Sequence, residues 1–177
     1  MDLWPIATAG RTVLDLGAST GGFTQVCLER GAAKVFAVDV GHGQLHPSVA
    51  DDSRVANLEG VDARGLDAAL IQTAPDLIVT DVSFIGLAKA LPAALVLARD
   101  GADLVALVKP QFEAGPRDVG KGGVVRDETV RARTLAEVTA FVEASGWSVQ
   151  ATTNSPIAGG DGNREYLLWA TKKAADH

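Results

Sequence analysis

The chain has 177 residues, 47% of them hydrophobic, and a formal net charge of −6 at pH 7. This length suits one domain with a substantial buried core, so we expect residues 1–177 to form a single domain. The hydrophobic content excludes a disordered chain, the apolar runs are too short for a membrane-spanning helix, and the acidic balance taken alone argues against a polyanionic partner.

Strand and helix patterns alternate through the first half of the chain. We predict strands over Thr12–Leu16, Lys34–Asp39, Arg54–Leu58 and Asp76–Thr80, and a helix over Thr20–Arg30. Such alternation is typical of an α/β fold in which helices cover both faces of a mostly parallel sheet.

The alternation continues in the second half of the chain. Gly86–Ala98 has a helical pattern, which Pro92 is expected to kink or break. Ala102–Val108 is almost entirely apolar, as is typical of a central strand in a parallel sheet. Asp127 is expected to cap a long helix that ends at Gly146.

Two late strands are predicted over Trp147–Thr153 and Glu165–Thr171, and Glu165 is expected to start an edge strand. The segment between them has no room for a helix, so they should pair as an antiparallel hairpin. Gln111–Val124 and Ser155–Arg164 are long irregular stretches. Loops of this kind at a sheet edge often contain functional residues.

Cysteine and histidine usage argues against disulfides and metals. Cys27 is the only cysteine, so no internal disulfide is expected, which is typical of a reducing, cytoplasmic compartment. His42, His46 and His177 have no recognised metal-ligand spacing, so we expect no metal site.

The strongest local motif is the run Asp15-Leu16-Gly17-Ala18-Ser19-Thr20-Gly21-Gly22-Phe23, which follows the first predicted strand and opens the first helix. Small residues let the backbone approach a ligand, and the helix start offers free N–H groups. A dinucleotide fingerprint would need glycine at Ser19, and a phosphate-binding loop would need lysine at Phe23. The motif therefore favours a nucleoside that has an amino-acid group and no phosphate.

Carboxylates at the next strand ends support this interpretation, although each alone is more often a turn or cap residue. Asp39 can accept both ribose hydroxyls, and Asp62 can accept from an adenine amino group. The candidate cofactor-binding residues are Asp15, Gly17, Ala18, Ser19, Gly21, Gly22, Phe23, Asp39, Val40, Asp62, Ala63 and Asp81.

Three polar residues at strand ends form a candidate reactive cluster: Asp81, Lys109 and Glu165. A lysine that closes an apolar strand is costly to desolvate, although it can also extend to water. Methyl transfer to an alcohol requires that the acceptor be positioned and lose a proton. A lysine held between two carboxylates could orient a hydroxyl and stabilise developing alkoxide charge.

The chain is less acidic between Lys109 and Arg133, where the charge is +2. A solvated loop and helix face would explain this window equally well. The alternative is RNA binding, for which the candidate residues are Arg117, Lys121, Arg126 and Arg164.

Five segments together resemble the hemolysin A (TlyA) type of FtsJ-like ribosomal RNA methyltransferases: Asp15–Gly22, Ala37–Leu45, Thr80–Ile85, Leu107–Glu113 and Gly120–Val125. The resemblance covers essentially the whole chain. It implies a Rossmann-like class I methyltransferase fold with a seven-stranded sheet, S-adenosyl-L-methionine as cofactor, and methylation of a ribose 2′-hydroxyl of ribosomal RNA. It also implies a Lys-Asp-Lys-Glu tetrad, whose last three members match Asp81, Lys109 and Glu165.

Two departures from the family pattern concern the N-terminal end. The first tetrad lysine lies upstream of the first strand, but Met1–Arg11 contain no lysine. The family's S4-like RNA-binding domain has no counterpart in the sequence, so the chain is expected to be an excised catalytic domain or a short form. We expect this chain alone to be a poor RNA methyltransferase that needs a separate or missing S4-like domain to act on ribosomal RNA or a ribosomal subunit.

Two alternative functions stay open. A methyltransferase for a small molecule or protein would need neither a basic rim nor the Asp81, Lys109 and Glu165 cluster. A cofactor- and RNA-binding module with impaired catalysis would fit the absence of the upstream lysine. No membrane partner is expected, since no segment has the length or amphipathic pattern to bind one.

Overall fold

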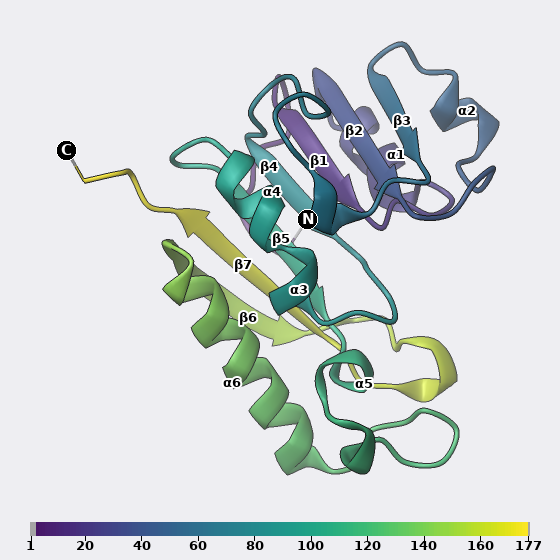
Figure 1. The fold of residues 1–177 in the computed structure, drawn as a ribbon, viewed down its shortest axis with the longest axis vertical. Helices are drawn as coiled ribbons and strands as arrows, with labels where there is room; N and C mark the ends of the chain where they lie inside the picture. The colour runs from purple at the N-terminus through teal and green to yellow at the C-terminus, as the bar shows by residue number, and fades with distance from the viewer. Residues whose placement is uncertain (1–2, 177) are drawn as a thin grey trace.

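The computed structural model describes residues 3–176. Seven strands form one sheet in the order β3-β2-β1-β4-β5-β7-β6, with helices on both faces (Figure 1). The strands are β1 (Thr12–Leu16), β2 (Lys34–Asp39), β3 (Val55–Glu59), β4 (Leu77–Thr80), β5 (Asp103–Val108), β6 (Trp147–Asn154) and β7 (Tyr166–Lys172). The helices are α1 (Gly22–Glu29), α2 (Pro47–Ala50), α3 (Leu87–Ala90), α4 (Pro92–Leu97), α5 (Pro110–Glu113) and α6 (Glu128–Ala144), with short 3₁₀ turns at Ala63–Gly65, Pro116–Asp118 and Gly160–Gly162.

The sheet is parallel from β3 to β5 and antiparallel in its last two strands. β1 pairs in parallel with β2 and β4, and β4 pairs in parallel with β5. β7 is antiparallel to both β5 and β6. The predicted α/β class and the predicted C-terminal hairpin are therefore confirmed.

One topological expectation is wrong. Glu165 was expected to begin an edge strand, but β7 lies between β5 and β6, and β6 forms the edge. The reason is that β7 makes two sets of backbone hydrogen bonds, one with the apolar strand β5 and one with its hairpin partner. Glu165 therefore precedes an interior strand whose start lies beside the end of β5.

Helix boundaries follow local backbone chemistry. The predicted helix over Gly86–Ala98 breaks at Pro92, with α3 ending at Ala90 and α4 beginning at the proline. The first helix begins at Gly22 rather than at Thr20, because Gly21 has a left-handed backbone with φ of 100°. Asp127 caps α6 as predicted, accepting a hydrogen bond from the N–H of Thr129.

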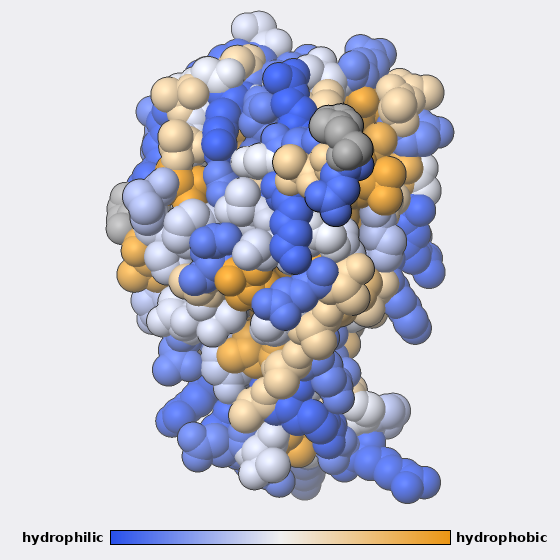
Figure 2. Space-filling view, turned by 90° about the vertical axis from the view of Figure 1, so that its left-hand side faces the viewer, coloured by the Kyte–Doolittle hydropathy of each residue, from blue (hydrophilic) through white to orange (hydrophobic). Residues whose placement is uncertain are grey.

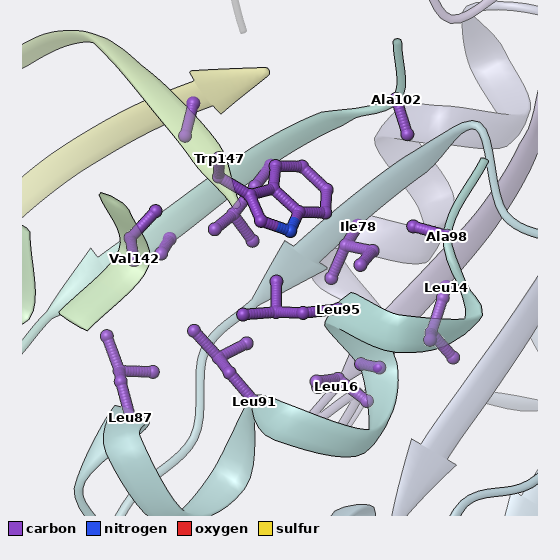
Figure 3. Close-up of a cluster of buried hydrophobic side chains, with 14 of the residues drawn as sticks. Leu14, Leu16, Ile78, Leu87, Leu91, Leu95, Ala98, Ala102, Val142 and Trp147 are labelled. Atoms are coloured by element: carbon purple, nitrogen blue, oxygen red, sulfur yellow. The ribbon is translucent and has the colours of Figure 1, made fainter. Parts of the chain in front are cut away.

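The core has one layer on each face of the sheet. On β1, Leu14 and Leu16 belong to the layer packed against α3, α4 and α6, whereas Val13 belongs to the layer packed against α1 and α2. This is the alternation expected of a strand covered on both faces. In the first layer Trp147 is fully buried among side chains from β4, α4 and α6 (Figure 3).

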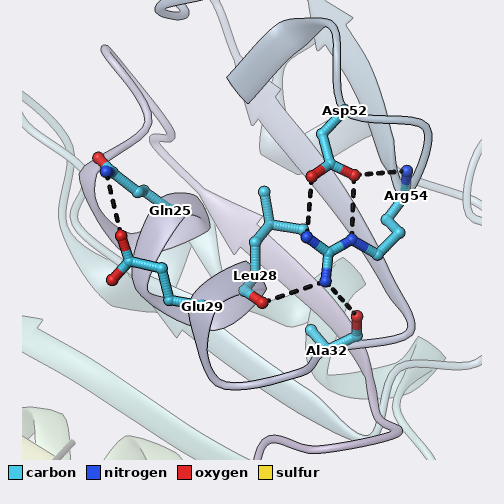
Figure 4. A network of polar contacts seen from close by, with 6 residues as sticks. All are labelled: Gln25, Leu28, Glu29, Ala32, Asp52 and Arg54. Carbon is cyan, nitrogen blue, oxygen red and sulfur yellow. Dashed lines mark hydrogen bonds and ion pairs between the residues drawn. The ribbon is translucent and has the colours of Figure 1, made fainter. Parts of the chain in front are cut away.

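A polar network lies at the C-terminal end of α1 (Figure 4). The Arg54 guanidinium donates to both carboxylate oxygens of Asp52 and to the carbonyl oxygen of Leu28, at 3.1 Å. This hydrogen bonding lowers the pKa of Asp52 to about 2. The arginine thereby adds a second hydrogen bond to a carbonyl in the last turn of α1, which also accepts from the N–H of Gly31 at 3.0 Å.

None of the helices within residues 3–176 has the length and apolar character needed to cross a membrane.

Candidate active site

A cleft of about 760 Å³ opens at the carboxyl ends of β1, β2 and β4. Doubly wound sheets bind their ligands at the carboxyl ends of the strands, at the point where the strand order reverses. In this sheet that point lies between β1 and β4. Seven of the predicted cofactor-binding residues line it: Gly17, Ser19, Asp39, Val40, Asp62, Ala63 and Asp81. The volume lies within the range typical of small-molecule sites.

The turn after β1 passes close to the neighbouring strands. The N–H groups of Gly17 and Ala18 donate to the carbonyl oxygen of Val38 on β2, at 2.9 and 3.0 Å. A Cβ atom on Gly17 would lie 2.5 Å from the carbonyl oxygen of Asp81, and Gly17 has a φ of +75°. Glycine is therefore required here both for backbone conformation and for space.

Asp39 is held rigidly at the end of β2. One carboxylate oxygen accepts from the N–H of Ser19, and the other accepts from the N–H of Gly41, each at 2.8 Å. A carboxylate has about four lone-pair sites, so each oxygen can accept a further hydrogen bond from a hydroxyl in the cleft. Asp39 thus has the position and the acceptor capacity predicted for it.

Asp62 has a partner that sequence reasoning did not identify. Its carboxylate accepts from the guanidinium of Arg64, at 2.6 Å for the shortest pair, and caps the turn at Ala63. These hydrogen bonds from Arg64 lower the pKa of Asp62 to about 2. Arg64 itself lines the cleft. The adenine-facing role of Asp62 stays a prediction, and any adenine would share this carboxylate with Arg64.

Asp15 lies beneath the Gly-rich turn and does not line the cleft. It is fully buried, and its Oδ2 atom accepts from the Thr24 hydroxyl at 2.7 Å. Burial is the main cause that raises the pKa of Asp15 to about 7. Its Oδ1 atom has no hydrogen-bond partner in the described part of the chain. The other predicted cofactor residues that do not line the cleft are Ala18, Gly21, Gly22 and Phe23.

Lys109 and Asp81 meet as predicted. The ammonium of Lys109 forms an ion pair with Oδ1 of Asp81 and donates to the hydroxyl of Ser83 at 3.2 Å. The Lys109 side chain is 12% exposed, against 40% for Asp81. Asp81 and Ser83 both line the cleft, so the lysine is aimed at its margin from the end of β5.

Glu165 has a different partner from the one expected. Its Oε2 atom accepts from the side-chain amide of Gln111 at 2.8 Å, and the residue is 8% exposed. Among residues 3–176, Lys109 forms an ion pair with Asp81 and none with Glu165. Asp81 and Glu165 therefore flank the segment that begins at Lys109, but only Asp81 contacts the lysine directly.

The segment after Lys109 connects the parts of this site. Gln111 holds Glu165, and the Phe112 ring packs on Phe84 with centroids 5.0 Å apart. A carboxylate oxygen of Glu113 accepts from the N–H of Leu87 at 2.9 Å. Sequence reasoning included this run in the family resemblance but assigned no role to Gln111, Phe112 or Glu113. The one signal in the sequence was their position: an amide, an aromatic ring and a carboxylate follow directly after the end of a strand.

No group of three or more histidine, cysteine, aspartate or glutamate side chains suited to a metal occurs in the described residues. His177 lies outside that range.

Comparison with known proteins assigns the chain to a family. A model of the FtsJ-like methyltransferases matches residues 2–172. The chain belongs to the FtsJ-like methyltransferase family. Its seven-stranded sheet is the class I methyltransferase fold that the sequence resemblance implied.

Named relatives of this FtsJ-like chain include the 16S/23S rRNA (cytidine-2′-O)-methyltransferase TlyA of Mycobacterium tuberculosis, which is 51% identical over 169 residues. That match covers 96% of this chain and 63% of the relative, so the chain spans less than two thirds of that protein's length. Hemolysin A of Brachyspira hyodysenteriae is 40% identical, over 92% of this chain and 68% of that protein. A solved structure from Streptococcus thermophilus, described as a hemolysin, has a TM-score of 0.94 at 40% identity and covers 98% of this chain and 63% of that one.

Two loops of the FtsJ-like domain meet at the narrow end of the molecule, beside Lys109. The buried side chain of Asn163 accepts from the N–H of Val125 at 3.0 Å and donates to the carbonyl oxygen of Gly123 at 2.9 Å. It thereby ties the Gly-rich loop, residues 115–126, to the loop before β7, residues 155–164. The predicted RNA-binding residues Arg117, Lys121, Arg126 and Arg164 are all exposed on these loops. Hydrophilic side chains cover much of this lower end (Figure 2).

Proposed function

We propose that this chain binds S-adenosyl-L-methionine in the cleft and transfers its methyl group to a ribose 2′-hydroxyl of ribosomal RNA. The observation that supports this most directly is the Lys109–Asp81 ion pair at the margin of the cleft. A methyltransferase for an already acidic acceptor would have no need of such a pair. In this proposal, residues 1–177 act as one domain.

The cleft fits the proposed cofactor. Gly17 lets the turn after β1 lie close to the backbone of Asp81, and Asp39 lines the cleft with its two carboxylate oxygens each accepting one backbone N–H. A ribose diol can donate to both of these oxygens. The cofactor, when bound, supplies a methyl group already activated by its positive sulfur.

The chain's own residues would position the acceptor and remove its proton. The acceptor hydroxyl would have to lose its proton as its oxygen receives the methyl group. Lys109 is held by Asp81 and Ser83, so its ammonium is oriented toward the place where negative charge develops on that oxygen. Asp81 reaches the cleft and is the carboxylate placed to accept a proton through water or directly.

Ribosomal RNA or a ribosomal subunit is the proposed substrate. Affinity for RNA comes mainly from basic contacts, which in this chain are concentrated on the loops at the Lys109 end. A separate S4-like RNA-binding domain would supply further basic contacts and place the target ribose at Lys109.

Two measurements test the proposal. Calorimetry should show that S-adenosylhomocysteine binds the wild type and that Asp39→Ala weakens the affinity by about tenfold or more, the value of a charge-assisted hydrogen bond. Equal affinity for both proteins, or tight binding of NAD instead, would contradict the cofactor assignment. Mass spectrometry of nucleosides, after incubation with ribosomal RNA and labelled cofactor with and without an added S4-like domain, should find the label in a 2′-O-methylnucleoside rather than in a methylated base.

A further inference from the structure

A second cavity, of about 380 Å³, lies beside Glu165 at the lower end of the molecule. It is enclosed by the first turn of α6, the end of β6 and the start of β7. Its polar lining includes Glu128 and Arg131 from α6, Asn154 from β6, and Arg164 with Glu165. Glu165 therefore stands between this cavity and Gln111, which follows Lys109 by two residues.

Apart from Arg30, the arginines of this chain form two groups. Arg11, Arg54, Arg64, Arg99 and Arg133 each form an ion pair with a carboxylate. The second group has no ion pair in the described part of the chain. Its members lie where the two loops meet the first turn of α6, a region called the loop end below: Arg117, Arg126, Arg131 and Arg164. Two of these residues, Arg131 and Arg164, line the same cavity.

Arg131 is fixed in place by backbone acceptors. Its Nη1 atom donates to the carbonyl oxygens of Val125 and Arg126, at 3.1 and 2.8 Å. A guanidinium has five N–H donors in a rigid fork, so others are left to face the cavity. A preorganised arginine beside a second, solvent-exposed arginine is suited to a phosphate group, which guanidinium binds with two parallel hydrogen bonds.

The rest of the lining is not suited to a bare anion. Glu128 would repel a free phosphate ion, but its carboxylate accepts hydrogen bonds from a hydroxyl or a base amino group. Asn154 and the Tyr166 ring add groups that can contact a sugar or base. The cavity therefore offers donors for a phosphate and acceptors for the hydroxyl and amino groups of a sugar and a base. This combination matches a nucleotide.

We propose that this cavity binds the nucleotide next to the methylated one in the RNA strand, with its phosphate on Arg131 and Arg164. The inference rests on the proposed RNA substrate and adds a subsite to it. Because Glu165 is the wall shared with the reactive cluster, occupancy of the cavity places the neighbouring ribose on the Lys109 side. The RNA strand is thereby bound on both sides of Glu165.

The test measures binding of a fluorescein-labelled single-stranded oligoribonucleotide to the whole chain over a range of salt concentrations. Arg131→Ala and Arg164→Ala should each weaken binding several-fold near 50 mM salt. Because both arginines contact the same phosphate, the double variant should reduce the salt slope by about 0.7, the value for one phosphate contact with a single strand. The matched control is Arg133→Ala, a residue on the same helix that already pairs with Asp118 at 2.7 Å, and its slope should equal that of the wild type.

Affinity for S-adenosylhomocysteine separates this inference from the proposed function. All the arginine variants should bind it like the wild type, which also verifies that they are folded. If the double variant retains the wild-type slope while the wild type binds both cofactor and RNA, the subsite is disproved and the proposed function stands. If the wild type binds cofactor but binds no RNA even when an S4-like domain is supplied, both the RNA substrate and the subsite are disproved.

Discussion

The cofactor cleft and the reactive end of this molecule are built in different ways. In the cleft, a backbone group of one turn binds the carboxylate at the end of the next strand, as where the N–H of Ser19 donates to Asp39 across 20 positions. At the reactive end, side chains meet across longer separations, as where Gln111 meets Glu165 across 54 positions. A site formed by a turn can be found from a motif, whereas a site formed by distant side chains depends on how the strands are ordered.

The two regions also differ in their charges. Asp39, Asp62 and Asp81 line the cleft, which suits hydroxyl and amino groups of a nucleoside. The loop end has arginines without ion pairs in the described residues, including Arg131 and Arg164. If this division is functional, substitutions at one end should leave the function of the other unchanged.

The largest expected effect is at Lys109. Lys109→Ala should lower the rate of methyl transfer by about two to four powers of ten and leave cofactor affinity nearly unchanged, because the ammonium faces the acceptor. Lys109→Arg should not restore the rate, since guanidinium is larger and planar. The measurement is single-turnover transfer to ribosomal RNA, under conditions in which the wild type is active. Near-normal transfer by Lys109→Ala would reduce the lysine to a structural partner of Asp81.

A smaller effect is expected at Gln111, which orients Glu165. Gln111→Leu removes the hydrogen bond to a buried carboxylate, so the transfer rate should fall by about 10- to 100-fold with cofactor affinity unchanged. The matched control is Gln25→Leu, because Gln25 also donates to a glutamate, Glu29, at 3.2 Å, but on an exposed face of α1. Equal rates for the two variants would show that Glu165 needs no positioning by Gln111.

A stability effect is expected on the cofactor side, at Asp15. Burial raises the pKa of Asp15 from 3.8 to about 7. Between these values the folded protein keeps a proton that the unfolded chain has released, so this group lowers the free energy of unfolding as the pH rises from about 4 to 7. Asp15→Asn has no such titration. Urea unfolding should show the wild type losing about 1.4 kcal/mol relative to Asp15→Asn between pH 5 and pH 6. A difference that does not change with pH would contradict the buried, protonated state.

The smallest effect is expected at Lys121 in the Gly-rich loop. Lys121→Ala should reduce the salt slope of RNA binding by roughly one unit or less, with no change in cofactor affinity. Lys34→Ala, at the opposite end of β2 from the cleft, is the control. The reverse result, weaker cofactor binding with an unchanged slope, would show that the loop covers the cofactor. It would also contradict the proposed separation between cofactor binding in the cleft and RNA binding at the loops.

Local features of the sequence determined much of the fold. The period of apolar residues predicts the strands, Pro92 predicts the break between α3 and α4, and Asp127 predicts the start of α6. The Gly-rich turn and Asp39 could be identified because backbone conformation and strand ends depend on neighbouring residues. The pairing of Lys109 with Asp81 followed from the same logic, since both end adjacent parallel strands.

The tertiary structure alone decided the remaining contacts. The position of β7 between β5 and β6 places Glu165 against Gln111 rather than Lys109, and it brings Arg131 and Arg164 to one cavity. The burial of Asp15 under the turn was equally undetermined, because a strand-end carboxylate can point to the cleft or to the core. The physical reason is the same throughout: strand order and side-chain burial result from packing between distant segments, which a local pattern does not encode.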